Sequence, residues 1–480
     1  MKANDLYESI GQADEDVLEQ SEKHKRNRVP RRPWWMAAAA AVLAAVIAAG
    51  VYFWPDGNPL VTSAYAICEA QYPEMNPYPE DYDDSFDARY DAWRESVEAQ
   101  HRPEGDADGL TPFFSSVTRK LLTGAGTKNR VCSPANLYMA IAMLAELTDG
   151  ESRQQILDAL GSDGIETLRA QASDVWNAQY RDDGATVIRL ANSVWLNEDI
   201  SFHQNTMNEL AKTYYASSYQ GETGSDGFNR ELQGWLKDQT GGLLEEAAQS
   251  VTLDPDTVLA LASTIYYSAN WANDFSEENT APDVFHGAAG DETVDFMHNS
   301  FDQHSYYWAD RFTAVSLPME NSGGRMWLIL PDESVSVDEL FADGDVETLL
   351  TAPRDWEQQR SMLVHLSMPK FDISSEFDLR EALKTLGITD VLDPSVSDFS
   401  PMTDDVDFVY LSKAQHDVRV TVDEEGVEAA AFTVMAMSGA GAPPDEIEEI
   451  DFTVDRPFLF VIMSDDNLPL FAGVVNQIGA

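Results

Sequence analysis

The sequence has little cysteine and none of the common catalytic motifs. Its two cysteines, Cys68 and Cys132, cannot form a disulfide framework, and the apolar setting of Cys132 suits a buried thiol. No CxxC pair or HExxH motif occurs and the eight histidines are scattered, so we expect no metal site and no cofactor. The GxSxG, GxxxxGK(S/T) and GxGxxG signatures are also absent, so we expect no catalytic residues of the common hydrolase or nucleotide-binding classes.

Basic charge is scarce as well. The chain has 31 Lys and Arg against 83 Asp and Glu, which gives a formal net charge of -52. Residues 1–33 hold equal numbers of each sign, so the whole excess of acid falls after residue 33. Such a surface repels phosphate backbones and attracts cationic partners, so we expect no nucleic-acid binding. The 44% hydrophobic content is typical of a globular chain with a large core.

One long hydrophobic run is present. Residues 34–54, WWMAAAAAVLAAVIAAGVYFW, carry no charge and are bracketed by tryptophans. This length spans the hydrocarbon core of a bilayer, and tryptophans favour its two interfaces. A cleaved secretory signal is the alternative, but the preceding segment is long and no clear small-x-small cleavage site follows. We therefore predict a single transmembrane helix.

The flanks of this run predict its orientation. The basic cluster KHKRNRVPRR lies directly before it, so the positive-inside rule makes residues 1–33 a short cytoplasmic segment. Everything after residue 54 is then outside. Residues 55–109 are rich in Pro, Tyr and acids and predict an extended, partly ordered spacer. The alternative is that their aromatic side chains pack on the next domain as a strap.

Residues 110–480 are globular in texture, with no second linker and no internal repeat. Helical periodicity marks PFFSSVTRKLL, PANLYMAIAMLAEL, ESRQQILDAL and FNRELQGWLKDQT. Strand-like runs concentrate later, at VIRLANSVWLN, VLALASTIYYS, RMWLILP, MLVHLSMPKFDI, VRVTVDEE, PFLFVIM and LFAGVVN. This order predicts an α+β fold with mixed or antiparallel sheets.

One stretch, EEGVEAAAFTVMAMSGAGAPP at residues 424–444, has no evident place in a compact fold. It lies between two predicted strands in a loop of about 25 residues, and loops of that length are usually functional or disordered. If residues 426–440 were extended, the face that begins at Val427 and ends at Gly439 would be small or apolar apart from one hydroxyl. No proline interrupts these residues, so every backbone N–H stays available for a sheet. We interpret the stretch as a strand held outside its sheet.

Two other structures are alternatives for this stretch. A flexible Gly/Ser linker would not sort its side chains by face. An amphipathic helix is favoured by Ala, Met and Glu but opposed by Val427, Thr433, Val434 and Gly439. A fluctuating helical turn is compatible with both the helix and the strand.

At these residues the sequence resembles the serpin family. DEEGVEAAAFT is similar to the serpin hinge, and further blocks across residues 110–480 stand in the family's order. Those blocks are VCSPANLYMAIAMLAEL, LANSVWLNEDISFHQNTMNELAKTYYA, LQGWLKDQTGGLLEEAA, IYYSANWANDF, MPKFDI, LKTLGITDVLD, LSKAQHDVRVTVDEEG, RPFLFVIM and LFAGVVN. Each block alone is a weak signal, but their common order is specific.

The resemblance implies a serpin fold with three sheets, eight or nine helices and an exposed reactive-centre loop. In the family, a target serine protease attacks this loop and forms an acyl-enzyme. The N-terminal side of the cut loop then inserts as a new strand in the main sheet and carries the protease with it. The implied function is a suicide-type protease inhibitor that is not itself an enzyme. The alternative is a non-inhibitory serpin that acts as an extracytoplasmic binding module.

The resemblance also assigns the hinge of the loop. Its entering face is small or apolar, so nothing there resists insertion, whereas Phe432 is bulky where the family favours small residues but lies on the other face. The residues assigned to the hinge are Glu424, Glu425, Gly426, Val427, Glu428, Ala429, Ala430 and Ala431.

The reactive bond follows from two counts made by analogy with the family. Counting forward from Gly426 and counting back from the proline pair both end at Ala440. We predict cleavage of Ala440–Gly441, with Met437–Ser438 as the alternative. Both bonds present a small or slim apolar side chain, which suits an elastase-like or subtilisin-like serine protease.

Further residues match the breach, where insertion begins at the top of the main sheet. Glu424 and Lys370 match the family's ion pair there, and Trp271 matches a tryptophan packed beside it. Ordinary core packing is the other role open to Trp271.

The shutter, a buried polar cluster through which the central strands part, is matched by Ser133 and His416. The sequence departs from the family at two positions. Asn136 stands where a serine is common, and Ser263 stands where an asparagine is expected.

The expected partners are a target serine protease, held in a covalent acyl complex, and the lipid bilayer through residues 34–54. We expect a monomer at the cell membrane, single-pass, with the serpin domain extracytoplasmic.

Overall fold

The computed structural model describes residues 65–79, 83, 85–100, 107–183, 186–342, 344–406, 408–412, 414–427 and 448–479. Contacts divide the chain into two compact units, Met1–Thr62 and Ser63–Ala480, and every described residue belongs to the second. The predicted cytoplasmic segment and the predicted transmembrane helix at residues 34–54 therefore lie outside the described residues. Among the helices that are described, none is long and apolar enough to cross a membrane.

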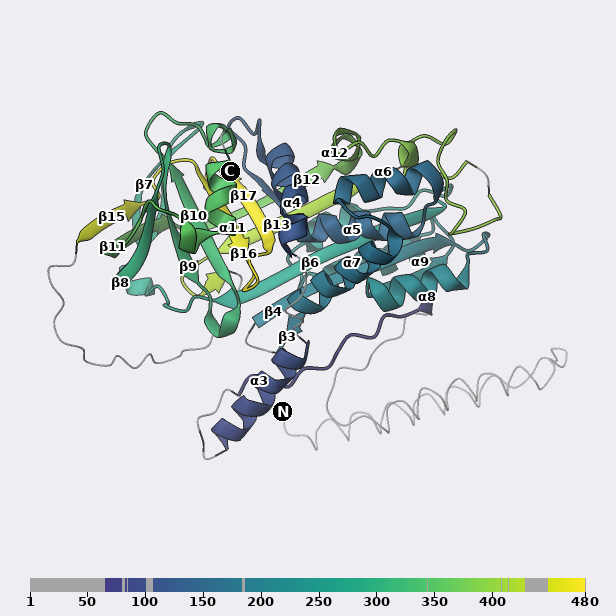
Figure 1. Ribbon diagram of the computed structural model, residues 1–480, viewed down its shortest axis with the longest axis horizontal. Helices are drawn as coiled ribbons and strands as arrows, with labels where there is room; N and C mark the ends of the chain where they lie inside the picture. The colour runs from purple at the N-terminus through teal and green to yellow at the C-terminus, as the bar shows by residue number, and fades with distance from the viewer. Residues whose placement is uncertain are drawn as a thin grey trace, which may run out of the picture. The chain divides into compact units, whose positions relative to one another are not determined.

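The main sheet has eight strands within the described residues (Figure 1). Its order is β1-β5-β4-β6-β14-β13-β12, with β3 paired to β4. β4 and β5 run parallel whereas β4 and β6 run antiparallel, so the sheet is mixed, as predicted. The strands are β1 (Ala66–Cys68), β3 (Arg181–Asp182), β4 (Thr186–Asn197), β5 (Ala216–Gly221), β6 (Leu259–Asn270), β12 (Phe371–Asp378), β13 (Gln415–Val422) and β14 (Gly426–Val427).

The second sheet has nine described strands in the order β15-β11-β8-β9-β10-β16-β17-β2, with β7 paired to β8. β10 and β16 are near-continuous apolar runs because both of their faces are covered, and every residue of β16 is buried. The strands are β2 (Arg130–Cys132), β7 (Ala281–Gly287), β8 (Gly290–Trp308), β9 (Phe312–Pro318), β10 (Arg325–Pro331), β11 (Gln359–Pro369), β15 (Glu449–Thr453), β16 (Phe458–Met463) and β17 (Pro469–Val475).

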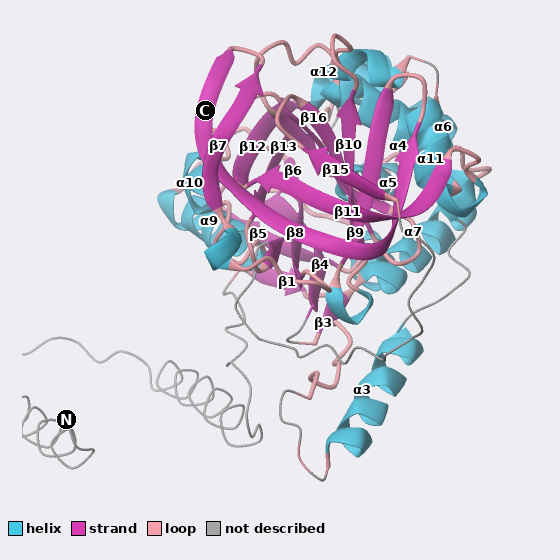
Figure 2. Ribbon diagram, turned by 90° about the vertical axis from the view of Figure 1, so that its left-hand side faces the viewer, coloured by secondary structure: helices cyan, strands magenta, loops and turns pink. Residues whose placement is uncertain are grey.

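The expectation of three sheets is wrong for the described residues, which form two. β8 is the cause, because this strand of 19 residues pairs with β7 at its start, with β9 at its end and with β11 along most of its length (Figure 2). A left-handed φ of 54° at Gln303, near a register shift between β8 and β11, bends the strand. Two of the expected sheets therefore share one strand.

The described residues contain ten α-helices, not the eight or nine expected. One of the ten, α3, lies in the region predicted as a spacer, and three others, α10, α11 and α12, have only six or seven residues. The α-helices are α3 (Phe86–Gln100), α4 (Ala107–Leu122), α5 (Pro134–Glu146), α6 (Gly150–Leu160), α7 (Ile165–Gln179), α8 (Gln204–Thr213), α9 (Asp226–Gln239), α10 (Glu245–Ser250), α11 (Asp345–Thr351) and α12 (Leu379–Thr385). The 3-10 helices are η1 (Glu277–Asn279), η2 (Glu320–Ser322), η3 (Val337–Phe341), η4 (Pro353–Asp355) and η5 (Asp390–Leu392).

α5 lies between the two sheets, where it contacts both β6 and β17. Its sequence is apolar on all sides, as a fully buried helix requires. The helix begins at Pro134, which suits the first helical position, and the Ser133 hydroxyl caps it by accepting the Asn136 N–H at 3.3 Å. α5 thus fixes two of the predicted shutter residues against β6.

α9 and α10 lie over the opposite, outer face of the main sheet. β4 alternates between the two faces, since Trp195 packs in the small apolar cluster under α9 while Val194 and Leu196 belong to the main core. The main sheet is therefore covered on both sides where β4 and β6 run.

Residues 65–79 and 85–100 are not an isolated spacer. They contain β1, which extends the main sheet, and α3, which contacts the body through Trp93. The structure thus favours the strap over the extended spacer for the described part of residues 55–109.

Candidate functional site

The hinge enters the main sheet at its centre. Gly426 and Val427 form β14 and pair antiparallel with Asn270 and Ala269 of β6. Val427 also pairs with Val422 of β13, so β14 is the described element between β6 and β13. Glycine is required at position 426 because a Cβ there would lie 2.2 Å from the carbonyl oxygen of Ala269.

The side chain of Val427 faces the core. Val427 is 3% exposed, and its two direct partners, Ala269 and Val422, are each 1% exposed. Residues directly opposite one another in a sheet share a face, so all three point to the same side. Val427 is the first residue of the small apolar face that the alternation in the sequence predicts, and the structure places it inside.

The remaining hinge residues and both predicted reactive bonds cannot be placed in this site. Glu428, Ala429, Ala430 and Ala431 lie outside the described residues, as do Ala440–Gly441 and Met437–Ser438.

Trp271 packs against the turn that leads from β13 into β14. Its indole N–H donates to the backbone oxygen of Asp423 at 2.9 Å, and its backbone N–H donates to the Glu425 carbonyl at 3.0 Å. The ring is fully buried and lies edge-on to Phe275 at 6.0 Å. Trp271 therefore supports the backbone of the hinge in addition to filling the core.

Lys370 and Glu424 meet beside this turn. Lys370 Nζ lies 2.6 Å from one carboxylate oxygen of Glu424, and the Thr280 hydroxyl donates to the other at 2.8 Å. Burial raises the pKa of Glu424, but the hydrogen bonds from Lys370 and Thr280 outweigh it and leave the pKa below its ordinary value. The hydrogen bond to Glu424 raises the pKa of Lys370. The pair is thus ionised and holds the start of the hinge against β11 and β12.

The four predicted shutter residues lie together where α5 meets the main sheet. The Ser133 backbone N–H donates to Nε2 of His416 at 3.0 Å, which requires a neutral ring protonated at Nδ1. Complete burial lowers the pKa of His416 to about 4, so the ring is neutral near pH 7. The Asn136 side-chain amide donates to the Ser263 carbonyl at 3.1 Å, and the Ser263 hydroxyl contacts the Asn136 side-chain oxygen. The exchanged Asn and Ser therefore still bond to each other.

Asn192, on β4, belongs to the same network and was not predicted. The Ser263 hydroxyl lies 2.7 Å from its side-chain oxygen, and its amide donates to the Tyr214 carbonyl at 2.8 Å. The signal in the sequence was a buried-strand pattern, LANSVWLN, interrupted by two polar residues. A polar group in such a run needs a partner, which is what Asn192 finds.

A cavity of about 130 Å³ lies beside β6, on the side toward β13. Its walls include Leu232 and Leu236 of α9, Ala248 of α10, residues 259–264 of β6, and Ala414 just before β13. The cavity follows the edge of β6 beneath the outer helices, and its walls also include polar side chains, among them Asp254 and Asp417.

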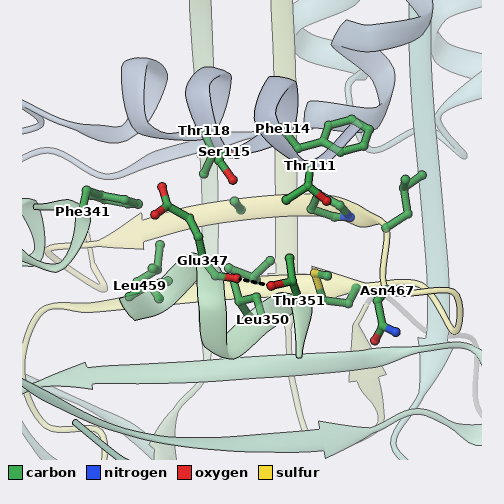
Figure 3. A pocket seen from close by; sticks show the side chains of 16 residues that line it. Thr111, Phe114, Ser115, Thr118, Phe341, Glu347, Leu350, Thr351, Leu459 and Asn467 are labelled. Atoms are coloured by element: carbon green, nitrogen blue, oxygen red, sulfur yellow. Dashed lines mark hydrogen bonds between the residues drawn. The ribbon is translucent and has the colours of Figure 1, made fainter. Parts of the chain in front are cut away.

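A second cavity separates α4 and α11 from β16 (Figure 3). Phe114 and Thr118 of α4, Leu350 of α11 and Leu459 of β16 contribute to its walls. Its volume of about 60 Å³ is far below the roughly 300 Å³ at which ligand sites begin, so we assign it no ligand. Among the described residues no group of three or more His, Cys, Asp and Glu side chains is placed to hold a metal ion.

Known proteins share this arrangement. The family model described as Serpin (serine protease inhibitor) matches residues 109–478. Serpin B11 of Mus musculus is 28% identical over 386 residues, which is 76% of this chain and 97% of that protein. Plasminogen activator inhibitor 1 of Bos taurus is 27% identical over 397 residues, 79% of this chain and 94% of that protein.

Solved structures agree in fold. The native state of Tengpin, a thermophilic serpin, matches with a TM-score of 0.68 at 24% identity and covers 85% of this chain and 98% of its own. Arabidopsis AtSerpin1 in its native stressed conformation matches with a TM-score of 0.65 at 24% identity, over 77% and 98% of the two chains. With the family model spanning 109–478, the hinge in the main sheet and the polar cluster beneath it, this chain belongs to the serpin family.

Proposed function

We propose that this serpin inhibits elastase-like or subtilisin-like serine proteases by the suicide route. The protease would cut the loop and form an acyl-enzyme, and the freed N-terminal side would enter the main sheet between β6 and β13. The observation that carries the proposal is Val427, whose side chain already lies between these strands and faces the core.

The register of β14 supports insertion of the following residues. If the antiparallel pairing continues, Thr433 comes opposite Ser263 on one side and His416 on the other. The one hydroxyl on the small apolar face would then lie at the polar shutter, where it can hydrogen-bond. In this register the polar side chain of the loop would lie beside polar residues of β6 and β13.

The cavity beside β6 supports the same register. Phe432, the one bulky residue of the hinge region, comes opposite Thr264 on the outer face of the sheet. Thr264 is among the residues that line this cavity, together with Leu236 of α9. An inserted Phe432 would therefore place its ring in this cavity, between Leu236 of α9 and Asp417 of β13, and would not clash with the sheet.

Loop composition supports the protease class. Ala440 or Met437 as the residue before the cut suits a small or slim apolar specificity pocket, whereas a trypsin-like pocket requires a basic residue. The excess of acid on the chain favours a cationic protease, and association with one should slow as the salt concentration rises.

An SDS-stable adduct tests the mechanism. The full-length protein is incubated with an elastase-like and a subtilisin-like protease, and with trypsin as the comparison. We expect an adduct of the summed mass with at least one of the first two, and a released peptide that begins at Gly441, or at Ser438 for the alternative bond. Cleavage without any adduct, and without a gain in thermal stability after cleavage, would instead identify a non-inhibitory serpin.

We also propose that residues 34–54 anchor the protein in the cell membrane with the serpin domain outside. The support is the uncharged run between tryptophans and the basic cluster before it. Protease digestion of intact cells should release the serpin domain while residues 1–33 stay protected. Recovery of the whole chain in the salt-washed soluble fraction would exclude the anchor.

A further inference from the structure

Residues 65–79, called the strap from here on, wrap the edge of the main sheet (Figure 1). β1 pairs antiparallel with β5, and the Gln220 N–H donates to the Tyr65 carbonyl at 2.8 Å. Further along, the Ala70 N–H donates to the Ser217 hydroxyl at 3.1 Å. The strap thus pairs with β5, which would otherwise be an edge strand.

The far end of the strap is firmly attached on the inner side of the sheet. Tyr72 packs against the rings of Trp176, Tyr180 and Tyr215, with centroids 5.5, 5.6 and 6.2 Å away. Beyond it, the Tyr78 N–H donates to a backbone oxygen on the turn before β4, at 2.8 Å. The strap is therefore fixed to α7 and to the turn before β4, in addition to its hydrogen bonds with β5.

The near end packs on the outer side, against α9. The Tyr65 ring lies 5.2 Å from the ring of Phe228, near the start of α9. Two glycines make room for it: a Cβ at Gly221 would lie 2.9 Å from the Tyr65 ring, and a Cβ at Gly227 would lie 3.0 Å from its hydroxyl. Gly227 is the second residue of α9, where any larger side chain would crowd the Tyr65 hydroxyl. The space that the Tyr65 side chain occupies therefore explains the glycine at position 227.

α9 in turn covers the route of an inserting strand. Leu232 and Leu236 of α9 line the cavity that follows β6 from Leu259 to Thr264. A strand that paired with the whole of β6 would pass beneath α9, and α9 must move outward to admit it. Any contact that holds α9 to the sheet therefore opposes this step.

We propose that Tyr65 is a positioning residue that holds α9 on the main sheet and so sets how fast the slot beside β6 admits the loop. The part of this inference that concerns the loop rests on the proposed function. The part that concerns α9 depends only on the contacts of Tyr65 with Phe228, Gly221 and Gly227.

The test is hydrogen exchange of full-length protein, followed by mass spectrometry, without any protease. Tyr65→Ala should raise the exchange rate of the α9 amides, residues 226–239, by about tenfold, because the helix loses its outer support. Tyr65→Phe keeps the ring and should stay within about twofold of wild type. Tyr72→Ala is the matched control: it should raise exchange in α7 and leave α9 unchanged.

A second readout concerns the loop. Tyr65→Ala should lose inhibitory capacity on warming several times faster than wild type, as the uncut loop enters the sheet part of the way, whereas Tyr72→Ala should do so no faster than its lowered stability predicts. If Tyr65→Ala does not fold, Tyr65→Leu serves, since it keeps apolar contact and loses the ring.

Unchanged α9 exchange in Tyr65→Ala, or equal effects of the two alanine variants on α9, would overturn the positioning role. If wild type forms no adduct with any protease, the proposed function fails, while the exchange result still decides whether Tyr65 holds α9.

Discussion

The main sheet receives an added strand at two places, and the two additions are unlike. At its edge, β1 joins β5 and is backed by rings on both faces of the sheet. At its centre, β14 contributes two residues between β6 and β13. Adding a strand at an edge disturbs no existing pair, whereas adding one at the centre requires two strands to part. The edge position is filled by β1, whereas the described part of the central strand stops after two residues. Under the proposed function, the cut loop would lengthen that central strand.

The central addition should be broken by a charge on its inner face. Val427→Arg would place a cation where the wild-type side chain is 3% exposed, and burying an unpaired charge costs several kcal/mol. We expect the hinge to leave the sheet and the protein to become a substrate, with at least a ~100-fold fall in the ratio of adduct to cleaved product. Densitometry of denaturing gels measures that ratio.

Glu425→Arg is the matched control, because Glu425 is exposed and directly precedes β14. It introduces the same side chain and should leave the ratio within about twofold of wild type. An adduct that survives Val427→Arg at the wild-type level would contradict insertion along this face.

Acid should weaken the centre of the sheet and spare its edge. The pKa of His416 is lowered from an ordinary 6.5 to about 4 by burial, so the folded protein prefers the neutral ring. The stability contributed is complete above pH 6.5 and is lost as the pH falls toward 4, by about 3 kcal/mol. Urea unfolding at a series of pH values measures the loss.

His416→Gln should flatten this part of the pH profile, because a glutamine oxygen can accept the Ser133 N–H and does not titrate. Hydrogen exchange at pH 5 should show the loss in β13 and not in β1. A pH profile identical to that of wild type would show that another group is responsible.

The contact of the strap with α7 should be weakened by Tyr72→Ala. Removing a ring packed against three others should lower the free energy of unfolding by about 2 kcal/mol. Phe408→Ala is the control, since that ring is 74% exposed and should contribute less than about 0.5 kcal/mol. Equal effects of the two substitutions would mean that the strap adds little to the stability of the fold.

The smallest effect is expected at the ion pair beside the hinge. Lys370→Met removes the partner of Glu424, but Lys370 is 39% exposed, so solvent screening limits the pair to about 1 kcal/mol. Because the pKa of Glu424 is lowered in the folded protein, this contribution is present above the ordinary carboxyl pKa and is lost as the pH falls through the folded value. We expect exchange of the Gly426 and Val427 amides to rise about threefold at pH 7. The difference from wild type should vanish in acid.

Local sequence predicted what depends on local pattern. The sequence predicted β16 and β17 because both are continuous apolar runs. It predicted the inward side chain of Val427 because successive side chains of a strand face opposite ways. The ion pair partners Lys370 and Glu424 were matched through family resemblance, and the structure brings them to 2.6 Å.

What the sequence could not predict depends on distant partners. β8 has few uninterrupted apolar residues, and its continuity across the second sheet is set by pairing with β7, β9 and β11. Asn192 shows no partner in the sequence, because the Ser263 hydroxyl and the Tyr214 carbonyl reach it only in the fold. The aromatic density of the strap suggested packing but could not say that Tyr65 and Tyr72 lie on opposite sides of one sheet edge.

The pairing of β15 with β11 sets a limit on the length of chain that an uncut loop can use. Val427 lies in the main sheet, whereas Glu449 pairs with Leu363 in the other sheet. A strand running from Val427 to Ala440 would extend about 43 Å, and the residues left before Glu449 span at most about 30 Å. With β15 in place, an intact loop is too short to enter completely and still return. Under the proposed function, hydrolysis of one peptide bond would remove that constraint, so the protease itself would supply the slack that the inserting strand needs.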